Sequence, residues 1–324
     1  MIKNRNIAKD AFIDASKIAG AGDGEVYYVA INTSKAYERL KGQVPSGHLF
    51  AASAAKADVA INAALSACVA DRDDKVIVMP GGYTLTATIT MSKSTTHLIC
   101  PAGLGCEVGA KNACRITAYA GTAAITITAA SCEVAGFYLK NANSSLTISL
   151  GAGSHCTHIH HNHFPLIWSS GAQKPAIQSA GTATMQNIER NYIFNYTGGQ
   201  SLTCADGLIH IDADGYLSRV CNNIIQVGAG GIATYGIHMS CSNGLIAYNV
   251  ITESGGGGTA PAGTVTAAVS GTASTSFVGN RCAVSTSGFS DASGSTGVSY
   301  TDNTNGVTNA KSGSADIMTA QLET

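Results

Sequence analysis

Short units with the same spacing of apolar residues recur along the middle of the chain, one about every 25 to 32 positions. Each unit contains an apolar residue, two further positions, usually an Asn, one more position and a second apolar residue. A repeat of this length is typical of one coil of a solenoid, in which each coil packs on the next. The six units are Val134-x-x-Phe137-x-Leu139, Ile159-x-x-Asn162-x-Phe164, Ile188-x-x-Asn191-x-Ile193, Val220-x-x-Asn223-x-Ile225, Ile246-x-x-Asn249-x-Ile251 and Phe277-x-x-Asn280-x-Cys282.

A second apolar segment precedes each unit, and apolar and polar residues alternate in it as well. Two or three short strands per coil, separated by Gly, Ser, Thr or Asn turns, indicate a parallel β-helix. The sequence therefore predicts an all-β fold, a parallel β-helix solenoid. The preceding segments are 124–128, 146–150, 176–178, 208–211, 235–239 and 265–269.

The Asn of each unit is predicted to lie at a corner of its coil. Asn tolerates the left-handed backbone of a sharp turn, and its amide can bond to the same amide one coil away, about 4.8 Å along the axis. We therefore expect Asn162, Asn191, Asn223 and Asn249 to occupy equivalent corners.

The first part of the chain does not follow the repeat. We expect an arm over residues 1–50, with a short strand at 25–30 and a helical turn at 35–41. Apolar residues at helical spacing over 53–70 predict a capping helix with Ser53 as its N-cap. Such a helix would cover the open end of the first coil. The predicted boundaries are an arm for attachment or assembly at 1–50, a capping helix at 51–74, the β-helix at 75–300 and a C-terminal tail at 301–324.

Composition agrees with tightly wound coils. Charged residues are only 12% of the chain and Gly is 37 of 324. This composition favours a fold of tight coils with small turn residues over a helical bundle. The formal net charge of −1 gives no electrostatic attraction to nucleic acid or an anionic membrane. No apolar run reaches the length of about 20 residues that a membrane helix needs, and the start of the chain lacks the apolar core of a secretory signal.

The ten Cys are spread along the chain without paired spacing, and no Cys-x-x-Cys occurs. We therefore expect reduced cysteines that pack as small apolar side chains, rather than disulfides or a cysteine zinc site.

The start of the predicted solenoid resembles a known family. The run Ala60-Ile61-Asn62-Ala63-Ala64-Leu65, a strand at 75–79 and the turn Pro80-Gly81-Gly82-Tyr83 are similar to the opening of right-handed β-helices of the pectate-lyase-like superfamily, which includes many bacteriophage tailspikes. The stretch from Asn4 to Ile18 also resembles the start of phage structural proteins. The resemblance implies a right-handed parallel β-helix solenoid and a virion protein, and it is more specific for fold than for function.

An enzyme that cuts polysaccharide would need acidic residues together on neighbouring coils. The acidic concentration in the repeats is Asp206, Asp212 and Asp214, with Glu189, Arg190 and Arg219 within a coil in sequence. The Asp212-Ala213-Asp214-Gly215 run is also typical of a turn, and this interpretation is favoured. The paired-Asp, Gly-His-Gly and Arg-x-Lys signatures of the polygalacturonase branch are absent.

Histidines supply the second set of candidates. Five lie between His155 and His163, and with Ile159 pointing inward, His158 and His160 should point outward side by side. A threefold axis could bring such pairs around one metal, as in His-x-His sites of some trimeric phage spikes, but an outer-face or subunit-contact role is favoured.

Two further groups of residues could serve either binding or packing, and a glycine run does not match a phosphate loop. His210 and His238 should lie one coil apart in the row of Gln178 and Ser149, as a packing ladder or a glycan-binding or subunit-contact row. Trp168, Tyr192 and Tyr196 could stack on sugar rings, although a single Trp more often plugs a loop. The run Gly255–Gly258 lacks the Lys-Ser/Thr of a phosphate loop.

Together these observations predict a non-enzymatic bacteriophage virion protein, a trimeric β-helix that decorates the capsid or forms a short fibre. Residues 1–50 would bind the major capsid protein or another virion protein, and assembly would take place in the host cytoplasm. The alternative is a tailspike that binds or cleaves host surface polysaccharide; a cell-associated adhesin is a weaker hypothesis. No catalytic, cofactor or metal residue is assigned.

Overall fold

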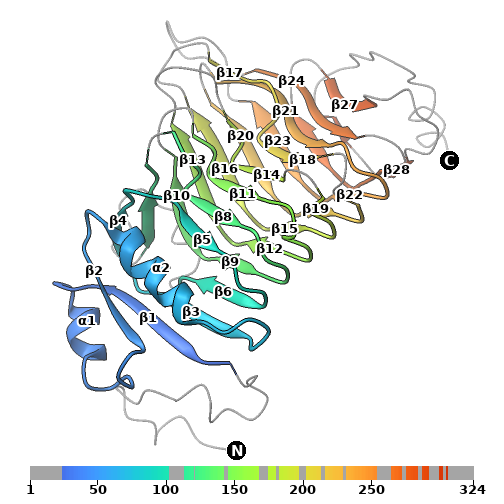
Figure 1. The fold of residues 1–324 in the computed structure, drawn as a ribbon. Coiled ribbons are helices and arrows are strands. Elements are labelled where there is room, and N and C mark those ends of the chain that lie inside the picture. Colours follow the sequence, from blue (N-terminus) through green and yellow to red (C-terminus); the bar gives the residue numbers. More distant parts are fainter. Residues whose placement is uncertain are drawn as a thin grey trace, which may run out of the picture.

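Three long parallel sheets stack along one axis and form a parallel β-helix, with the N-terminus at one end (Figure 1). The computed structural model describes residues 24–101, 113–119, 121–141, 145–167, 174–179, 182–196, 202–212, 216–228, 231–253, 264–271, 275–283, 287–291, 299–301 and 304–305. The predicted fold class is thereby confirmed, including the capping helix before the first coil.

Each coil adds one strand to each sheet. The 11-stranded first sheet runs in the order β2 (Leu49–Ala52), β1 (Val26–Ile31), β3 (Asp74–Val78), β6 (Thr96–Ile99), β9 (Glu133–Ala135), β12 (His158–His160), β15 (Asn187–Glu189), β19 (Arg219–Cys221), β22 (Leu245–Ala247), β25 (Ser276–Val278) and β28 (Ser299–Thr301).

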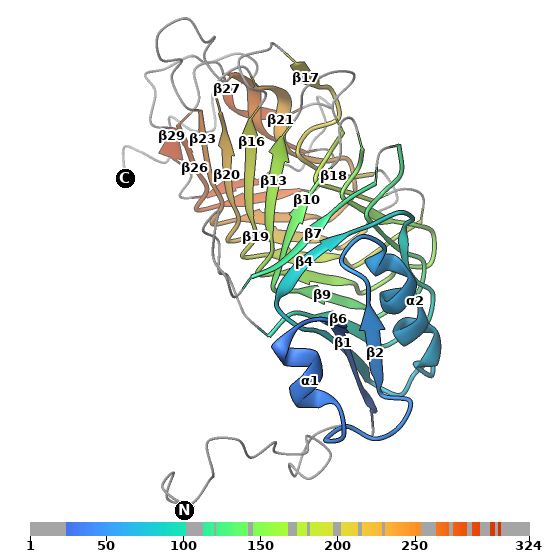
Figure 2. The same ribbon diagram turned by 90° about the vertical axis from the view of Figure 1, so that its left-hand side faces the viewer.

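The other two sheets follow the same axis, and the second is the one toward the viewer in Figure 2. The second sheet contains β4 (Gly81–Thr84), β7 (Cys114–Thr117), β10 (Phe137–Lys140), β13 (His163–Ile167), β16 (Tyr192–Tyr196), β20 (Ile224–Val227), β23 (Val250–Glu253), β26 (Arg281–Ala283) and β29 (Thr304–Asn305). The third contains β5 (Ile89–Met91), β8 (Ile125–Ile127), β11 (Ile148–Leu150), β14 (Ile177–Ser179), β18 (Ile209–Ile211), β21 (Gly231–Met239), β24 (Thr264–Gly271) and β27 (Ser287–Asp291), with β17 (Leu202–Cys204) beside β21.

The core is a column of apolar side chains, to which each strand contributes one or two, as Ile148 and Leu150 of β11 show. In the first sheet, Ile159 pairs with Val134 on one side and Ile188 on the other, and all three are fully buried. Ile125, Ile148, Ile177, Ile209 and Ile237 stack in the same way in the third sheet. Burying each such side chain contributes about 1.5 to 3 kcal/mol, so the alternation seen in sequence sets which face of each strand is inside.

The predicted Asn ladder is present at the corner between the first and second sheets. The Oδ1 of Asn191 accepts from the backbone N–H of Asn162, at 3.1 Å, and the Oδ1 of Asn223 accepts from that of Asn191, at 3.0 Å. The same bond recurs from Asn223 to Asn249 and from Asn249 to Asn280. At the start of the ladder, the Oδ1 of Asn162 accepts from the N–H of Phe137, which takes the Asn position in its own coil.

The backbone role predicted for these Asn residues is wrong. The left-handed residue is the one just before each of them: His161, Arg190, Asn222 and Tyr248 have φ between 53° and 57°. The preceding residue turns the chain, which leaves the Asn side chain free to reach along the axis. At Gly136 the same position has φ 83°, and a Cβ there would lie 2.2 Å from the carbonyl oxygen of Cys100.

Helix α2 (Ala57–Ala67) covers the open end of the column. Its Asn62 donates to the carbonyl of Thr88 and accepts from the N–H of Thr90, both at 2.9 Å, and thus pairs backbone groups along the edge of β5. Asp58 accepts from the N–H of Thr86 at 2.6 Å. The predicted N-cap Ser53 is wrong, because the N-cap residue is Lys56 and makes no side-chain capping bond.

The N-terminal segment belongs to the folded body from residue 24 on. Strand β1 pairs with β3, and β2 pairs with β1, so this part of the expected arm extends the first sheet. The short helix α1 (Lys35–Leu40), which begins at N-cap Ser34, connects the two strands. Residues 1–23 lie outside the described residues.

At the other end, β28 and β29 continue the coils to Asn305, beyond the predicted boundary at 300.

Nine cysteines lie in the described part of the chain, and all are free. All of these except Cys156 are buried, as the sequence predicted for reduced thiols in coils. Burial raises the pKa of the Cys241 thiol to about 11 and that of Cys204 to about 12, so these thiols stay protonated. None of the described helices is long and apolar enough to cross a membrane.

Candidate functional site

The outer face of the first sheet carries the densest group of ionisable side chains. Pairing between coils places Lys75, His97, Glu133, His158 and Asn187 in one outward row. A second outward row contains Ala135, His160 and Glu189. The two rows lie side by side because successive outward residues of a strand are two positions apart.

His158 and His160 lie next to each other on β12, as predicted. Their ring centroids are 3.9 Å apart. Each imidazole has a carboxylate partner on a neighbouring coil: His158 Nε2 donates to Glu189 at 2.9 Å, and His160 Nε2 donates to Glu133 at 2.6 Å. The pair is therefore held between carboxylates of the coil below and the coil above.

A hydrogen-bonded chain continues from Glu133 toward the N-terminal end. His97 donates from Nδ1 to Glu133 at 2.5 Å and from Nε2 to Asp73 at 2.6 Å. Asp73 also accepts from Lys75 at 2.9 Å. On the other side, the Nδ1 atoms of His160 and His161 are 2.7 Å apart, so one of them donates to the other.

These contacts shift the pKa values of the group in different directions. Hydrogen bonds from His160 and His97 hold the pKa of Glu133 well below its usual range. The hydrogen bond with Glu133 raises the pKa of His97. Burial lowers the pKa of His158, and the neighbouring His160 lowers it further. His158 therefore favours the neutral imidazole beside an ionised carboxylate.

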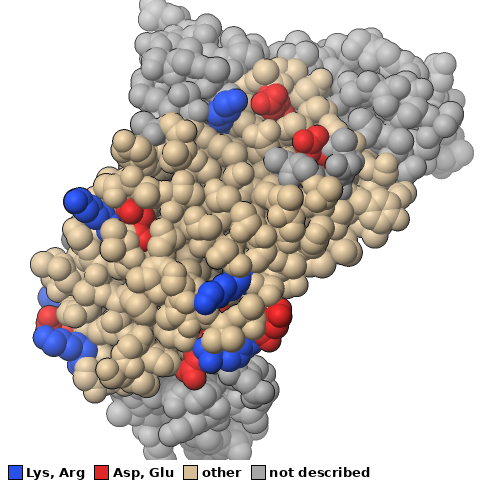
Figure 3. Space-filling view, in the orientation of Figure 1, with Lys and Arg blue, Asp and Glu red and all other residues tan. Residues whose placement is uncertain are grey.

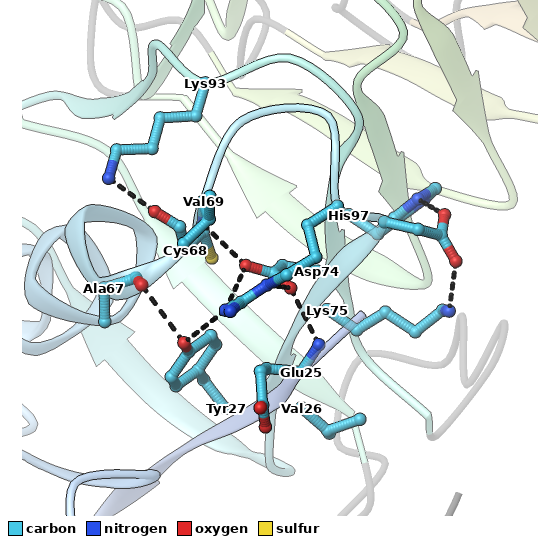
Figure 4. A network of polar contacts seen from close by, with 12 residues as sticks. Glu25, Val26, Tyr27, Ala67, Cys68, Val69, Asp74, Lys75, Lys93 and His97 are labelled. Carbon is cyan, nitrogen blue, oxygen red and sulfur yellow. Dashed lines mark hydrogen bonds and ion pairs between the residues drawn. The ribbon is translucent and has the colours of Figure 1, made fainter. Parts of the chain in front are cut away.

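A separate polar network joins the N-terminal strand to the first coil (Figure 4). The carboxylate of Asp74, which is fully buried, accepts from Arg72 at 2.8 and 2.9 Å and from the N–H groups of Glu25 and Val69. Arg72 also donates to the Tyr27 hydroxyl, which donates to the carbonyl of Ala67 at the end of α2. Lys93 donates to the carbonyl of Cys68. This network connects β1, α2 and β3, and its role is structural.

One group of described His, Cys, Asp and Glu side chains has a ligand set for a metal ion. One ligand atom each from Glu133, His158 and His160 lies within 4.8 Å of the other two. All three side chains are partly exposed, at 21%, 35% and 17% for Glu133, His158 and His160. Two imidazoles and a carboxylate suit divalent zinc and other first-row transition metals.

The histidine row of the third sheet is also confirmed in its register. His210 pairs with Gln178 and with His238, and Gln178 pairs with Ser149. The imidazoles of His210 and His238 stack with centroids 4.9 Å apart and an interplanar angle of 4°. Burial lowers the pKa of both. Stacked, neutral and partly buried rings fit the ladder packing that the sequence analysis considered.

Among the described residues, the acidic candidates divide between two faces of the coil. Glu189 pairs with His158, on the first sheet. Asp206 and Asp212 lie near His210 and His238, where the negative charges raise the pKa of His238 against the effect of burial. The backbone N–H of Asp212 donates to Ser179. Asp214, Trp168 and Gly255–Gly258 lie outside the described residues. Tyr192 donates to Gln226 at 2.9 Å, and its ring lies 4.8 Å from that of His163.

Sequence reasoning missed Glu133 and His97, which complete the histidine cluster. A signal for Glu133 was available: Val134 and Ile159 open two successive units, so Glu133 has to lie beside His158. His97 precedes the first unit, and only the pairing of β6 with β9 shows its position.

The fold places the chain in the class of parallel β-helix proteins. No protein-family model and no curated protein matches the sequence. Among solved structures, the chain is similar to ORF18 of Geobacillus virus E2, with 10% identity, a TM-score of 0.33, and coverage of 87% of this chain and 73% of that one. A likeness at this level assigns neither family nor activity.

Proposed function

We propose that the protein is a non-enzymatic structural component of a bacteriophage particle, a β-helical rod that decorates the capsid or forms a short fibre. The observation that carries the proposal is the first sheet, which runs through 11 strands from β2 to β28. One sheet thus joins the N-terminal segment to the last described coil, which suits a rigid projection held at its N-terminal end. The sequence resemblance of residues 4–18 to phage structural proteins supports the same role.

The outer surface agrees with a structural role. Most of the face in Figure 3 carries neither acidic nor basic side chains. Charged residues of the first coils are tied to one another, as in the Asp73–Lys75 and Asp74–Arg72 pairs. A surface with few free charges suits contacts with other protein subunits better than recognition of a charged polymer.

Association into a homotrimer is part of the proposal. At the corner before the first sheet, the exposed residues Met185 and Leu217 lie one coil apart, with Tyr216 beside Leu217. Contact between copies of the rod would remove these apolar side chains from water. In a closed threefold arrangement, each of the three rods has this surface covered by a neighbour. Sedimentation equilibrium would give the number of chains.

Labelling of purified particles tests the function. Antibody raised against the β-helix should bind intact virions at a defined position, and the protein should appear among the virion proteins by mass spectrometry. A chain that lacks residues 1–23 should fold but fail to enter particles, because we assign attachment to the N-terminal segment. Absence of the parent protein from purified virions would reject the proposal.

A further inference from the structure

We propose that Glu133, His158 and His160 form a binding site for one divalent transition-metal ion of the zinc type, held within a single chain. The three residues come from adjacent strands of the first sheet, with Glu133 on β9 and both histidines on β12. The site differs from the arrangement expected around a threefold axis, because one chain supplies all three ligands. It is independent of the role proposed for the whole protein.

The ligand geometry is close to that of an occupied site. Ligand atoms of a tetrahedral zinc ion lie about 3.4 Å apart, given bonds of about 2.0 to 2.2 Å. The three atoms here lie within 4.8 Å of one another. Rotation of the partly exposed side chains closes the remaining gap of up to about 1.4 Å, and the exposure leaves a further coordination position open to water.

The surrounding residues orient the ligands in the manner of a metal site. His97 donates to Glu133 Oε2, so Oε1 is the oxygen that faces His160. The contact between the Nδ1 atoms of His160 and His161 allows His160 to keep its proton on Nδ1 and to offer Nε2 to the ion. Outer hydrogen bonds that fix the tautomer and direction of a ligand are a general feature of metal sites.

Two carboxylates lie beside the imidazoles and attract a cation. The carboxylates of Glu133 and Glu189 flank the two imidazoles, each at hydrogen-bond distance from one of them. An ion at this position replaces the hydrogen that His160 Nε2 donates to Glu133. A neutral His160 retains this proton by moving it to Nδ1, where it is donated to His161, whereas an imidazolium passes its Nε2 proton to solvent. The ion then links two successive coils in place of that hydrogen bond.

Direct titration tests the site. The full chain, freed of metal with a chelator and carrying Cys156→Ser to remove the exposed thiol, should bind one Zn²⁺ per chain by calorimetry. His158→Ala, His160→Ala and Glu133→Gln should each weaken binding more than about tenfold, since even loss of an outer partner costs about 10- to 100-fold. His210→Ala is the matched control, because it removes one ring of another stacked pair, and it should leave affinity unchanged.

Two further readouts extend the test, and the first does not depend on the folding of a ligand variant. Zn²⁺ should protect His158 and His160 of the otherwise unaltered chain from imidazole acylation, mapped by mass spectrometry, but should not protect His210. Co²⁺ should give absorption bands of nitrogen and oxygen ligands, and these should disappear in His158→Ala. Unchanged Zn²⁺ affinity in the His158→Ala/His160→Ala double variant, one ion per three chains, or no protection of these histidines would overturn the proposal.

Discussion

At the scale of single residues, the Asn ladder joins successive coils through buried side-chain hydrogen bonds. The side chain of Asn191 is buried, accepts from the N–H and the amide of Asn162, and donates to Ile159 and Asn223. Because each member serves the coil before and the coil after it, loss of one amide leaves buried polar groups of two coils without a partner.

Replacing Asn191 by Leu should therefore lower the free energy of unfolding by at least about 2 kcal/mol. Denaturant unfolding followed by circular dichroism measures this. Asn187→Leu is the control in the same coil, since Asn187 lies in the outward row beside His158, and it should cost much less. Equal effects of the two substitutions would contradict a role for the ladder.

Asp74 makes stability depend on pH. Burial alone would raise the pKa of its carboxyl, but hydrogen bonds from Arg72 and from the N–H groups of Val69 and Glu25 outweigh burial and lower the pKa. A lowered folded-state pKa stabilises the protein above the ordinary carboxyl pKa of about 3.9, and this contribution is lost as pH falls through the folded-state pKa.

Asp74→Asn should accordingly cost about 2 to 3 kcal/mol at pH 7 and progressively less as the pH falls below about 4. Unfolding curves of both proteins at a series of pH values give the comparison. A difference that stayed constant down to the lowest pH at which the protein folds would show that the charge of Asp74 does not matter. Glu25→Gln is the control, because Glu25 meets Asp74 through its backbone N–H.

At the scale of elements, the N-terminal strands protect the first coil. Without β1, the edge of β3 would expose its backbone groups, and the buried side chains of Val76 and Val78 would lose cover. Helix α2 closes the third sheet in a different way, through the side chain of Asn62.

Two truncations test whether β1 and β2 protect the edge of β3. A chain starting at residue 24 should remain monodisperse by size-exclusion chromatography and unfold at the same temperature as the parent. A chain starting at residue 53 should form soluble aggregates, because the edge of β3 becomes available to other chains. A well-behaved second truncation would mean that β1 and β2 are dispensable for folding.

At the scale of the whole molecule, the solenoid distributes its ionisable groups over separate faces. The cluster of Glu133, His158 and His160 lies on the first sheet, and the row with His210 and His238 lies on the third. In the first group the carboxylates are hydrogen-bonded to the imidazoles, as in the His158–Glu189 and His160–Glu133 pairs. Hydrolysis or elimination of a glycan instead needs two ionisable groups that are free to act on the substrate in one groove.

We therefore predict that the pure protein does not cleave glycans. Incubation with host capsule, lipopolysaccharide and polyuronates, with assays for reducing ends and unsaturated products, should give no turnover. Turnover that is lost in Asp212→Asn or Asp214→Asn would instead indicate the tailspike enzyme.

The sequence by itself determined the coil. Alternation of apolar and polar residues shows which side chains enter the column, and the spacing of Asn162, Asn191, Asn223 and Asn249 marks one corner per turn. Both signals are local in each unit, and stacking of equivalent units follows from burial and backbone pairing. The inward direction of Ile159 was sufficient to predict the adjacent His158 and His160.

Only the tertiary structure decided which charged groups meet and which residue carries the turn. Glu133 and His160 are 27 positions apart, and the coils differ in length, so their contact depends on pairing between β9 and β12. The left-handed backbone falls on Arg190 and Tyr248, and neither residue type favours that conformation. At these positions the pairing of adjacent coils overrides local preference, since each strand gains its hydrogen bonds and its buried face from its neighbours.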